Sequence, residues 1–201
     1  MERKYAEFAA TKACELLAID SPSGYTRKAA DWVKEAFSSL GFDAQLTTKG
    51  GVLVNLGGAD KKDALLLEAH TDTLGAMVAE VKANGRLRLT PLGGMRAENA
   101  ETENVRVHTR TGRIIEGTVQ LCNASVHVNG QYGETKRSFD TVEAVLDEDV
   151  KTADETRALG VEVGDIVCFE PLLHQTDGWN EDDVLHIAVV AQPVLIIIYI
   201  I

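Results

Sequence analysis

The sequence has little positive charge, few cysteines and no long hydrophobic run. Its 20 Lys and Arg residues are outnumbered by 31 Asp and Glu residues, which gives a formal net charge of −11 at pH 7. A nucleic-acid-binding protein normally has a basic stripe, and none is visible here. The longest apolar run, residues 194–201, is shorter than the roughly 20 residues that span a bilayer. We therefore expect neither a nucleic-acid partner nor a membrane partner.

The cysteines are too few and too scattered for a disulfide framework. Cys14, Cys122 and Cys168 are odd in number, and no pair of them has the spacing of a metal knuckle. This pattern favours a reducing compartment, so we expect a cytoplasmic protein. Cys122 and Cys168 fall within apolar strand patterns, which predict packed thiols. The charged N-terminus, residues 1–7, does not resemble a signal peptide.

Motifs of several enzyme classes are also missing. Neither Gly57-Gly58 nor Gly93-Gly94 is followed by the Lys and Ser/Thr of a phosphate-binding loop. No His-Glu-x-x-His zinc-protease motif occurs. What is present is an ordinary globular composition: 201 residues, of which 45% are hydrophobic. This length predicts one domain, or two small ones.

The first third of the chain predicts an α/β layer. Apolar residues recur at helical spacing over residues 4–18 and, more clearly, over 29–40, with a break at residues 21–24. Three strand-like runs follow, at residues 44–47, 52–56 and 64–69. The last run is almost continuously apolar, which predicts a strand buried on both faces. Helices followed by buried strands indicate an α/β arrangement.

After residue 75 the sequence predicts a β-rich domain. Asn84-Gly85 lies between alternating runs, and Thr111-Gly112 separates two more, so each predicts a hairpin. Thr152 and Glu155 have capping-box spacing before a short helix that Gly160 ends. Further strands are predicted over residues 141–146 and 161–169. We predict three segments: 1–75 in the α/β layer, 76–165 as the β-rich domain, and 166–201 returning to the α/β layer.

His70 and Asp72 are the first candidate site, directly after the predicted strand over residues 64–69. Functional groups gather beyond the carboxyl ends of strands in open α/β sheets. His70 can offer one imidazole nitrogen to a metal while Asp72 holds the other nitrogen. If the strand continues through Asp72, both side chains lie on one face. A hydrogen-bonded histidine beside a turn-forming aspartate is the open alternative.

Residues 174–186 are the second candidate site. They contain two histidines and four carboxylates, and Asp182 and His186 would share a face of a helix. Such groups suit hard or borderline metals. The open alternative is a solvated acidic loop. The apolar residues 194–201 that follow predict a buried strand or an association surface.

Several motifs occur together in a characteristic order. Residues 21–24 read Ser-Pro-Ser-Gly, and residues 67–78 read Leu-Glu-Ala-His-Thr-Asp-Thr-Leu-Gly-Ala-Met-Val. The β-rich segment adds motifs at residues 90–94, 124–128 and 163–167. Over residues 1–171 the chain thus resembles the co-catalytic metallo-aminopeptidases, a family that includes glutamyl aminopeptidases, tetrahedral aminopeptidases and proteins once labelled cellulase M.

The resemblance implies a fold and a chemistry. The expected fold is part of a three-layer α/β catalytic domain with a small β-barrel-like domain inserted for homo-oligomer assembly. The implied activity releases N-terminal residues from peptides with two divalent metals, usually zinc or cobalt, that activate a water. His70 maps onto a metal ligand, Asp72 onto the catalytic residue that orients its imidazole, and Asp182 onto a metal-bridging ligand.

The last part of the sequence departs from the family pattern. No Glu-Glu pair follows residues 181–183, so the general base and the later metal ligands of the family have no counterpart. A C-terminal truncation, a frameshift or divergence is expected to explain this. Two interpretations stay open: a metal-dependent aminopeptidase, or a catalytically incomplete, self-associating remnant of the family. An unrelated β-domain binding module is a third.

Overall fold

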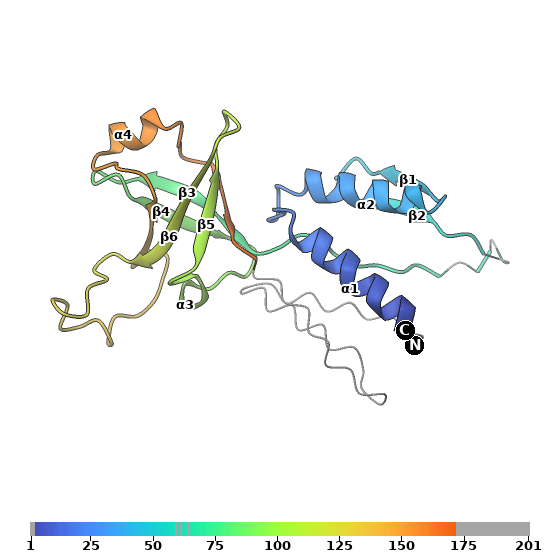
Figure 1. The fold of residues 1–201 in the computed structure, drawn as a ribbon, viewed down its shortest axis with the longest axis horizontal. Coiled ribbons are helices and arrows are strands. Elements are labelled where there is room, and N and C mark those ends of the chain that lie inside the picture. The colour runs from blue at the N-terminus through green and yellow to red at the C-terminus, as the bar shows by residue number, and fades with distance from the viewer. Residues whose placement is uncertain (1–2, 59, 61, 64, 172–201) are drawn as a thin grey trace.

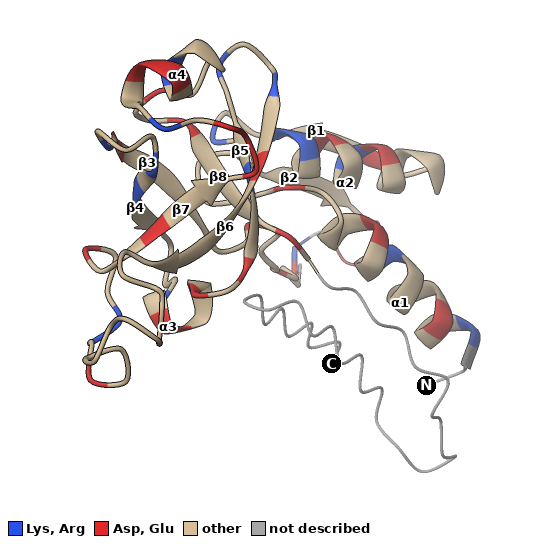
Figure 2. Ribbon diagram, turned by 60° about the vertical axis from the view of Figure 1, so that its left-hand side comes forward, with Lys and Arg blue, Asp and Glu red and all other residues tan. Residues whose placement is uncertain are grey.

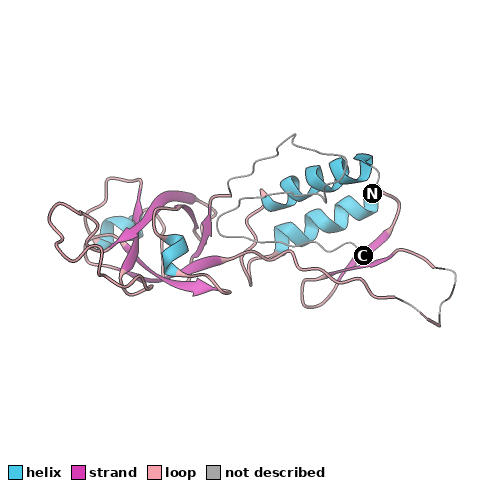
Figure 3. Cartoon of the chain, turned by 90° about the horizontal axis from the view of Figure 1, so that it is seen from below, coloured by secondary structure: helices cyan, strands magenta, loops and turns pink. Residues whose placement is uncertain are grey.

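The computed structural model describes residues 3–58, 60, 62–63 and 65–171 (Figure 1). Two helices and a β-hairpin form a unit at one end of an elongated molecule, and a β-barrel lies at the other end (Figures 1 and 3). The helices are α1 (Arg3–Leu17), α2 (Arg27–Ser39), α3 (Ala97–Ala100) and α4 (Ala153–Ala158). The strands are β1 (Asp43–Leu46), β2 (Val52–Asn55), β3 (Gly75–Val81), β4 (Leu87–Leu92), β5 (Asn104–His108), β6 (Ile114–Leu121), β7 (Val142–Leu146) and β8 (Ile166–Phe169).

The N-terminal unit contains both predicted helices. The small residues Ala29 and Ala30 of α2 are buried, as are Ala6 and Ala10 of α1. The first two predicted strands, β1 and β2, form an antiparallel pair. Local amphipathic spacing was therefore sufficient to predict these elements.

The predicted buried strand over residues 64–69 is wrong for the residues that the structure describes. Residues 65–70 form no strand, and Leu65, Leu66 and Leu67 are 85%, 75% and 71% exposed. A strand needs neighbours for its backbone hydrogen bonds and covering layers for its side chains. The described residues provide neither around this run, so its apolar composition alone does not make it a strand.

Strands β3–β8 form a closed barrel in the order β3-β4-β7-β6-β5-β8. All neighbours are antiparallel. The buried core side chains come from residues 76–169 and include Val78, Leu87, Leu89, Val105, Val107, Val119, Leu121 and Val167. The barrel therefore has a hydrophobic core that is made entirely from its own segment.

The two predicted hairpins of the barrel are confirmed. Gly85 and Gly112 have φ values of 81° and 84° in the turns that join β3 to β4 and β5 to β6. Glycine adopts such backbone angles without the steric cost that a Cβ atom brings. The capping box of α4 is also confirmed: the Thr152 side chain accepts from the Glu155 backbone N–H, and the Glu155 side chain accepts from the Thr152 backbone N–H.

The predicted strand over residues 161–169 is shorter in the structure. Only β8 is extended, because a turn at residues 162–165 precedes it and Gly164 has a φ of 93°. β8 also pairs with β3 and β5 and closes the barrel, although it lies beyond residue 165, the predicted end of the β-rich domain. The division into three segments and the three-layer catalytic arrangement stay predictions.

The N-terminal unit is held against the barrel at the start of β3. Pro22 forms a parallel bridge with Thr73, whose backbone N–H donates to the Ser21 carbonyl at 2.7 Å. A Cβ atom at Gly75 would lie 2.6 Å from the Cβ of Pro22. Only glycine therefore allows the turn after α1 to approach β3 so closely.

Some predictions lie outside the described residues, namely those on residues 174–186 and 194–201. Among the helices that the structure describes, none is long and apolar enough to cross a membrane. Acidic and basic stretches are mixed over the helices and the barrel (Figure 2). All three cysteines are free, but Cys122 is exposed, so its predicted packing is wrong, while Cys168 is buried as predicted.

Candidate functional site

His70 and Asp72 meet side chain to side chain, in the segment that leads into β3. His70 Nδ1 lies 3.1 Å from Asp72 Oδ1 and 3.1 Å from the Asp72 backbone carbonyl oxygen. Both oxygens are acceptors, so Nδ1 must carry the proton and donate. In the neutral imidazole, Nε2 then has the free lone pair that a metal ion requires.

A third side chain extends this pair. The Ser23 hydroxyl donates to Asp72 Oδ2 at 2.5 Å, so each carboxylate oxygen of Asp72 has a partner. The backbone link between Thr73 and Ser21 holds the same turn in place. The chain Ser23–Asp72–His70 fixes the carboxylate and, through it, the imidazole ring. Ser23 belongs to the motif at residues 21–24, but its contact with Asp72 joins residues 49 positions apart, so no local pattern predicts it.

The predicted residue pair is accessible from solvent. The side chains of His70 and Asp72 are 66% and 40% exposed. The backbone of residues 70–72 is irregular, so the pair forms without the shared strand face that a continuing strand would provide. This geometry fits one ligand of a metal site. Asp182, the other predicted metal ligand, lies outside the described residues.

A second polar cluster lies between the N-terminal unit and the barrel. Arg106 on β5 donates to Asp20 from Nη2 at 2.6 Å and from Nε at 3.2 Å. His108 Nε2 lies 2.7 Å from Asp20 Oδ2, and Tyr25 Oη lies 3.4 Å from His108 Nδ1. The two units are thus joined by a largely buried ionic network, in which the side chains of Asp20 and His108 are 15% and 7% exposed.

The charge state of Asp20 follows from these contacts. Burial by itself raises the pKa of this carboxyl group, but the hydrogen bonds and charges of Arg106 and His108 outweigh burial and hold the pKa below its usual value. Asp20 is therefore ionised at neutral pH. A buried carboxylate of this kind is tolerated because its charge is paired and hydrogen-bonded.

The cluster of Asp20, Tyr25, Arg106 and His108 is not predicted by the sequence. Asp20 and His108 are 88 positions apart, and no local pattern links them. The available signal was weak: Arg106 and His108 occupy one face of a strand whose other face carries Val105 and Val107. Polar side chains on the outer face of a barrel strand are ordinary, so only the fold distinguishes these two.

Comparison with known proteins identifies relatives of this chain. Residues 50–180 match the model of a family described as M42 glutamyl aminopeptidase. YhfE of Bacillus subtilis (strain 168), named as an aminopeptidase, is 36% identical over 162 residues, which is 81% of this chain and 47% of that protein.

Solved structures of aminopeptidases have a similar fold. The aminopeptidase APDkam598 from the archaeon Desulfurococcus kamchatkensis has a TM-score of 0.70 at 25% identity, over 88% of this chain and 46% of that one. The Pyrococcus horikoshii TET1 peptidase, which can assemble into a tetrahedron or a large octahedral shell, has a TM-score of 0.63 at 22% identity, over 81% of this chain and 46% of that one.

These matches cover much of this chain but only part of its relatives. The chain spans about half the length of the proteins that it matches. The family model alone extends over more than half of the 201 residues, including His70, Asp72 and the whole barrel. The order of motifs, the barrel and the family match agree: the chain belongs to the M42 glutamyl aminopeptidase family.

Proposed function

We propose that this chain carries the first metal-ligand motif of a metal-dependent aminopeptidase that hydrolyses N-terminal residues from peptides. The observation that carries the proposal is the hydrogen-bonded chain from Ser23 through Asp72 to His70, within the segment that matches the family. It leaves His70 Nε2 available as a ligand. In this proposal Asp72 is the catalytic residue that orients the imidazole.

The residues fit a divalent metal, zinc or cobalt. An imidazole whose second nitrogen donates to a carboxylate is the usual arrangement around zinc ligands, because the carboxylate fixes the tautomer and raises ligand basicity. We propose His70 and Asp182 as ligands. A bound divalent metal lowers the pKa of a water molecule and polarises a peptide carbonyl. His70 supplies a neutral nitrogen ligand, and Asp72 and Ser23 keep its ring in place.

The barrel has a separate proposed role in homo-oligomer assembly. Support comes from the TET1 peptidase, whose fold is similar and which assembles into large particles. The barrel has its own core, so it can present an interface without relying on the α/β part. We also propose a cytoplasmic location, which three free cysteines support.

A catalytically incomplete, self-associating member of the family is the second proposed function. The observation that favours it is the exposure of Leu65, Leu66 and Leu67, since contiguous exposed apolar side chains mark association surfaces.

One pair of measurements separates the two functions. The purified chain is titrated with Zn²⁺ by calorimetry and assayed with aminoacyl-anilide substrates, next to His70→Ala and the exposed control His127→Ala. The aminopeptidase proposal predicts turnover that His70→Ala abolishes together with zinc affinity at that site, while His127→Ala leaves both unchanged. Turnover that survives His70→Ala would overturn it. Zinc binding without turnover, together with oligomers by light scattering, would support the incomplete member instead.

A further inference from the structure

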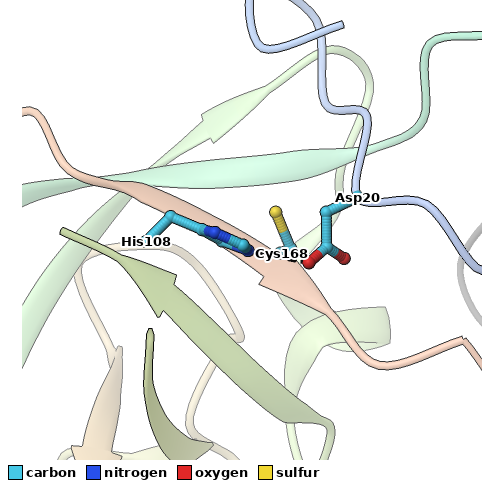
Figure 4. A group of neighbouring side chains, drawn as sticks. All are labelled: Asp20, His108 and Cys168. Carbon is cyan, nitrogen blue, oxygen red and sulfur yellow. Dashed lines mark hydrogen bonds and ion pairs between the residues drawn. The ribbon is translucent and has the colours of Figure 1, made fainter. Parts of the chain in front are cut away.

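Three side chains that bind metals well meet where the N-terminal unit joins the barrel (Figure 4). Asp20 follows α1, His108 ends β5 and Cys168 lies in β8. Their potential ligand atoms, a carboxylate oxygen, an imidazole nitrogen and a sulfur, all lie within 4.8 Å of one another. Figure 4 shows the three side chains pointing toward a common centre.

The strand register explains why they converge. Arg106 of β5 lies opposite Cys168 of β8, so Arg106, His108 and Cys168 project from one face of the barrel wall. Val107 and Val167 project from the other face into the core. Cys168 faces outward, yet it is only 2% exposed, which indicates that the segment around Asp20 covers it.

We propose that Asp20, His108 and Cys168 form a binding site for a thiophilic divalent cation such as Zn²⁺, distinct from the His70 motif. Zinc accepts these three ligand types and commonly takes three protein ligands with a water as the fourth. Zinc–ligand bonds of 2.0–2.3 Å imply separations of about 3.3–3.8 Å between the ligand atoms of a tetrahedral site. Asp20 Oδ2 and His108 Nε2 are closer than this, at 2.7 Å, and the sulfur lies within 4.8 Å of both, so the three side chains would have to shift to enclose an ion.

The neighbouring groups already suit such an ion. Tyr25 Oη lies 3.4 Å from His108 Nδ1, where it can accept a hydrogen bond from the ring once Nε2 binds the metal. Arg106 donates to Asp20 Oδ1 at 2.6 Å from Nη2 and to Oδ2 at 3.2 Å from Nε, and the second lone pair of Oδ2 is then the one that would bind the ion. Glu170 lies 3.9 Å from Arg106 and offsets its charge. Asp20 and a Cys168 thiolate then provide two negative charges for the divalent cation.

Binding requires a neutral His108 ring and a deprotonated Cys168. In the neutral imidazole, Nε2–H donates to Asp20, and on metal binding this proton moves to Nδ1, beside Tyr25. The thiol of Cys168 loses its proton to solvent. Burial, followed by the charge of Asp20, raises the pKa of Cys168, so the thiol is neutral in the metal-free chain. The thiolate is therefore expected only when the metal is bound.

Cobalt makes a selective probe of this site. The whole chain is stripped with a chelator and titrated with Co²⁺, and the thiolate-to-cobalt charge-transfer absorption is recorded. One equivalent of this absorption is expected. It should persist in His70→Ala, Cys14→Ser and Cys122→Ser, disappear in Cys168→Ser, and be removed when Zn²⁺ is added. The control cysteine variants are matched, since Cys14 and Cys122 are also free thiols.

A second set of variants keeps the test valid if Cys168→Ser does not fold. His108→Ala and Asp20→Asn should weaken cobalt binding about tenfold or more in a chain whose circular dichroism is unchanged. Absence of the absorption in the folded chain, or its survival in Cys168→Ser, would overturn the proposal. This test is separate from the test of the proposed function. The aminopeptidase motif contains no cysteine, so turnover measured in the Cys168→Ser chain tests the proposed function, whereas the cobalt absorption tests the Cys168 site.

Discussion

Glu143 lies on β7 in the barrel wall and is buried, with an exposed fraction of 1%. Lys82 and Arg86, on either side of the β3–β4 turn, each contact it at 2.5 Å. Lys82 and Arg86 reach solvent, since their side chains are 30% and 36% exposed. The carboxylate is therefore stabilised by two cations that remain partly hydrated, and it ties the first barrel hairpin to β7.

Removing this charge should destabilise the barrel. We expect Glu143→Gln to lower the free energy of unfolding by about 2 kcal/mol, because hydrogen bonds to charged groups each contribute roughly 1.5–3 kcal/mol. Urea denaturation measures the change. Glu80→Gln is the matched control, since the Glu80–Arg88 pair is exposed on both sides and should contribute well under 1 kcal/mol. Equal effects of the two substitutions would contradict the prediction.

The same group predicts a dependence of stability on acid. Burial raises the pKa of Glu143, but Lys82 and Arg86 outweigh burial and hold the pKa below its usual value. Its stabilising contribution is therefore complete above the usual glutamate range and disappears as the pH falls through the lowered pKa. Unfolding free energies between pH 7 and pH 3 should decline less steeply for Glu143→Gln than for the unmodified chain. Parallel curves would show that Glu143 does not titrate differently in the folded state.

Ser23 is a positioning residue for the proposed metal ligand. We expect Ser23→Ala to reduce zinc affinity at His70 by about tenfold, because it removes the hydrogen bond that fixes the second oxygen of Asp72. Competition titration in a Cys168→Ser background isolates that site. Ser39→Ala, at the exposed end of α2, should have no effect. A structural role alone would change the melting temperature without changing the affinity.

At the scale of secondary-structure elements, the approach of the N-terminal turn to β3 depends on Gly75. Its missing side chain makes room for Pro22, and a Cβ atom would lie 2.6 Å from the proline ring. We expect Gly75→Ala to lower the unfolding free energy by about 1–3 kcal/mol, the usual cost of overpacking. Thermal and urea unfolding measure this loss of stability. Gly94→Ala is the control, because no atom lies within 4 Å of a Cβ placed there. An unchanged stability in Gly75→Ala would mean that the turn relaxes freely.

Element prediction succeeded where the signal was local. The hairpins at Gly85 and Gly112 and the capping box at Thr152 depend on residues within a few positions of one another. The run at residues 65–69 has a strand-like sequence, but a strand also needs neighbouring strands, and the described residues provide none there. The apolar pattern therefore predicted burial that the tertiary structure does not supply.

At the scale of the whole molecule, the barrel is the self-sufficient unit. Its core side chains come from residues 76–169, and its strands close into a barrel without help from the N-terminal unit. We expect a protein of residues 74–170 to fold alone and to unfold cooperatively. Circular dichroism melting and urea titration test this, with the core substitution Val119→Asp as a control that should abolish the transition. A non-cooperative melt of the unsubstituted segment would show that the N-terminal unit is required.

The sequence by itself determined the membership of the family, the helices of the N-terminal unit, the barrel hairpins, and the pairing of His70 with Asp72 two positions later. Family membership follows from the order of the motifs along the chain, and the other features follow from periodicity, turn chemistry and short spacing, which are properties of neighbouring residues. Only the tertiary structure decided that Ser23 holds Asp72 and that Asp20, His108 and Cys168 meet. Asp20 and His108 meet where the N-terminal unit joins the barrel, although they are 88 positions apart along the chain. No local pattern encodes such a contact.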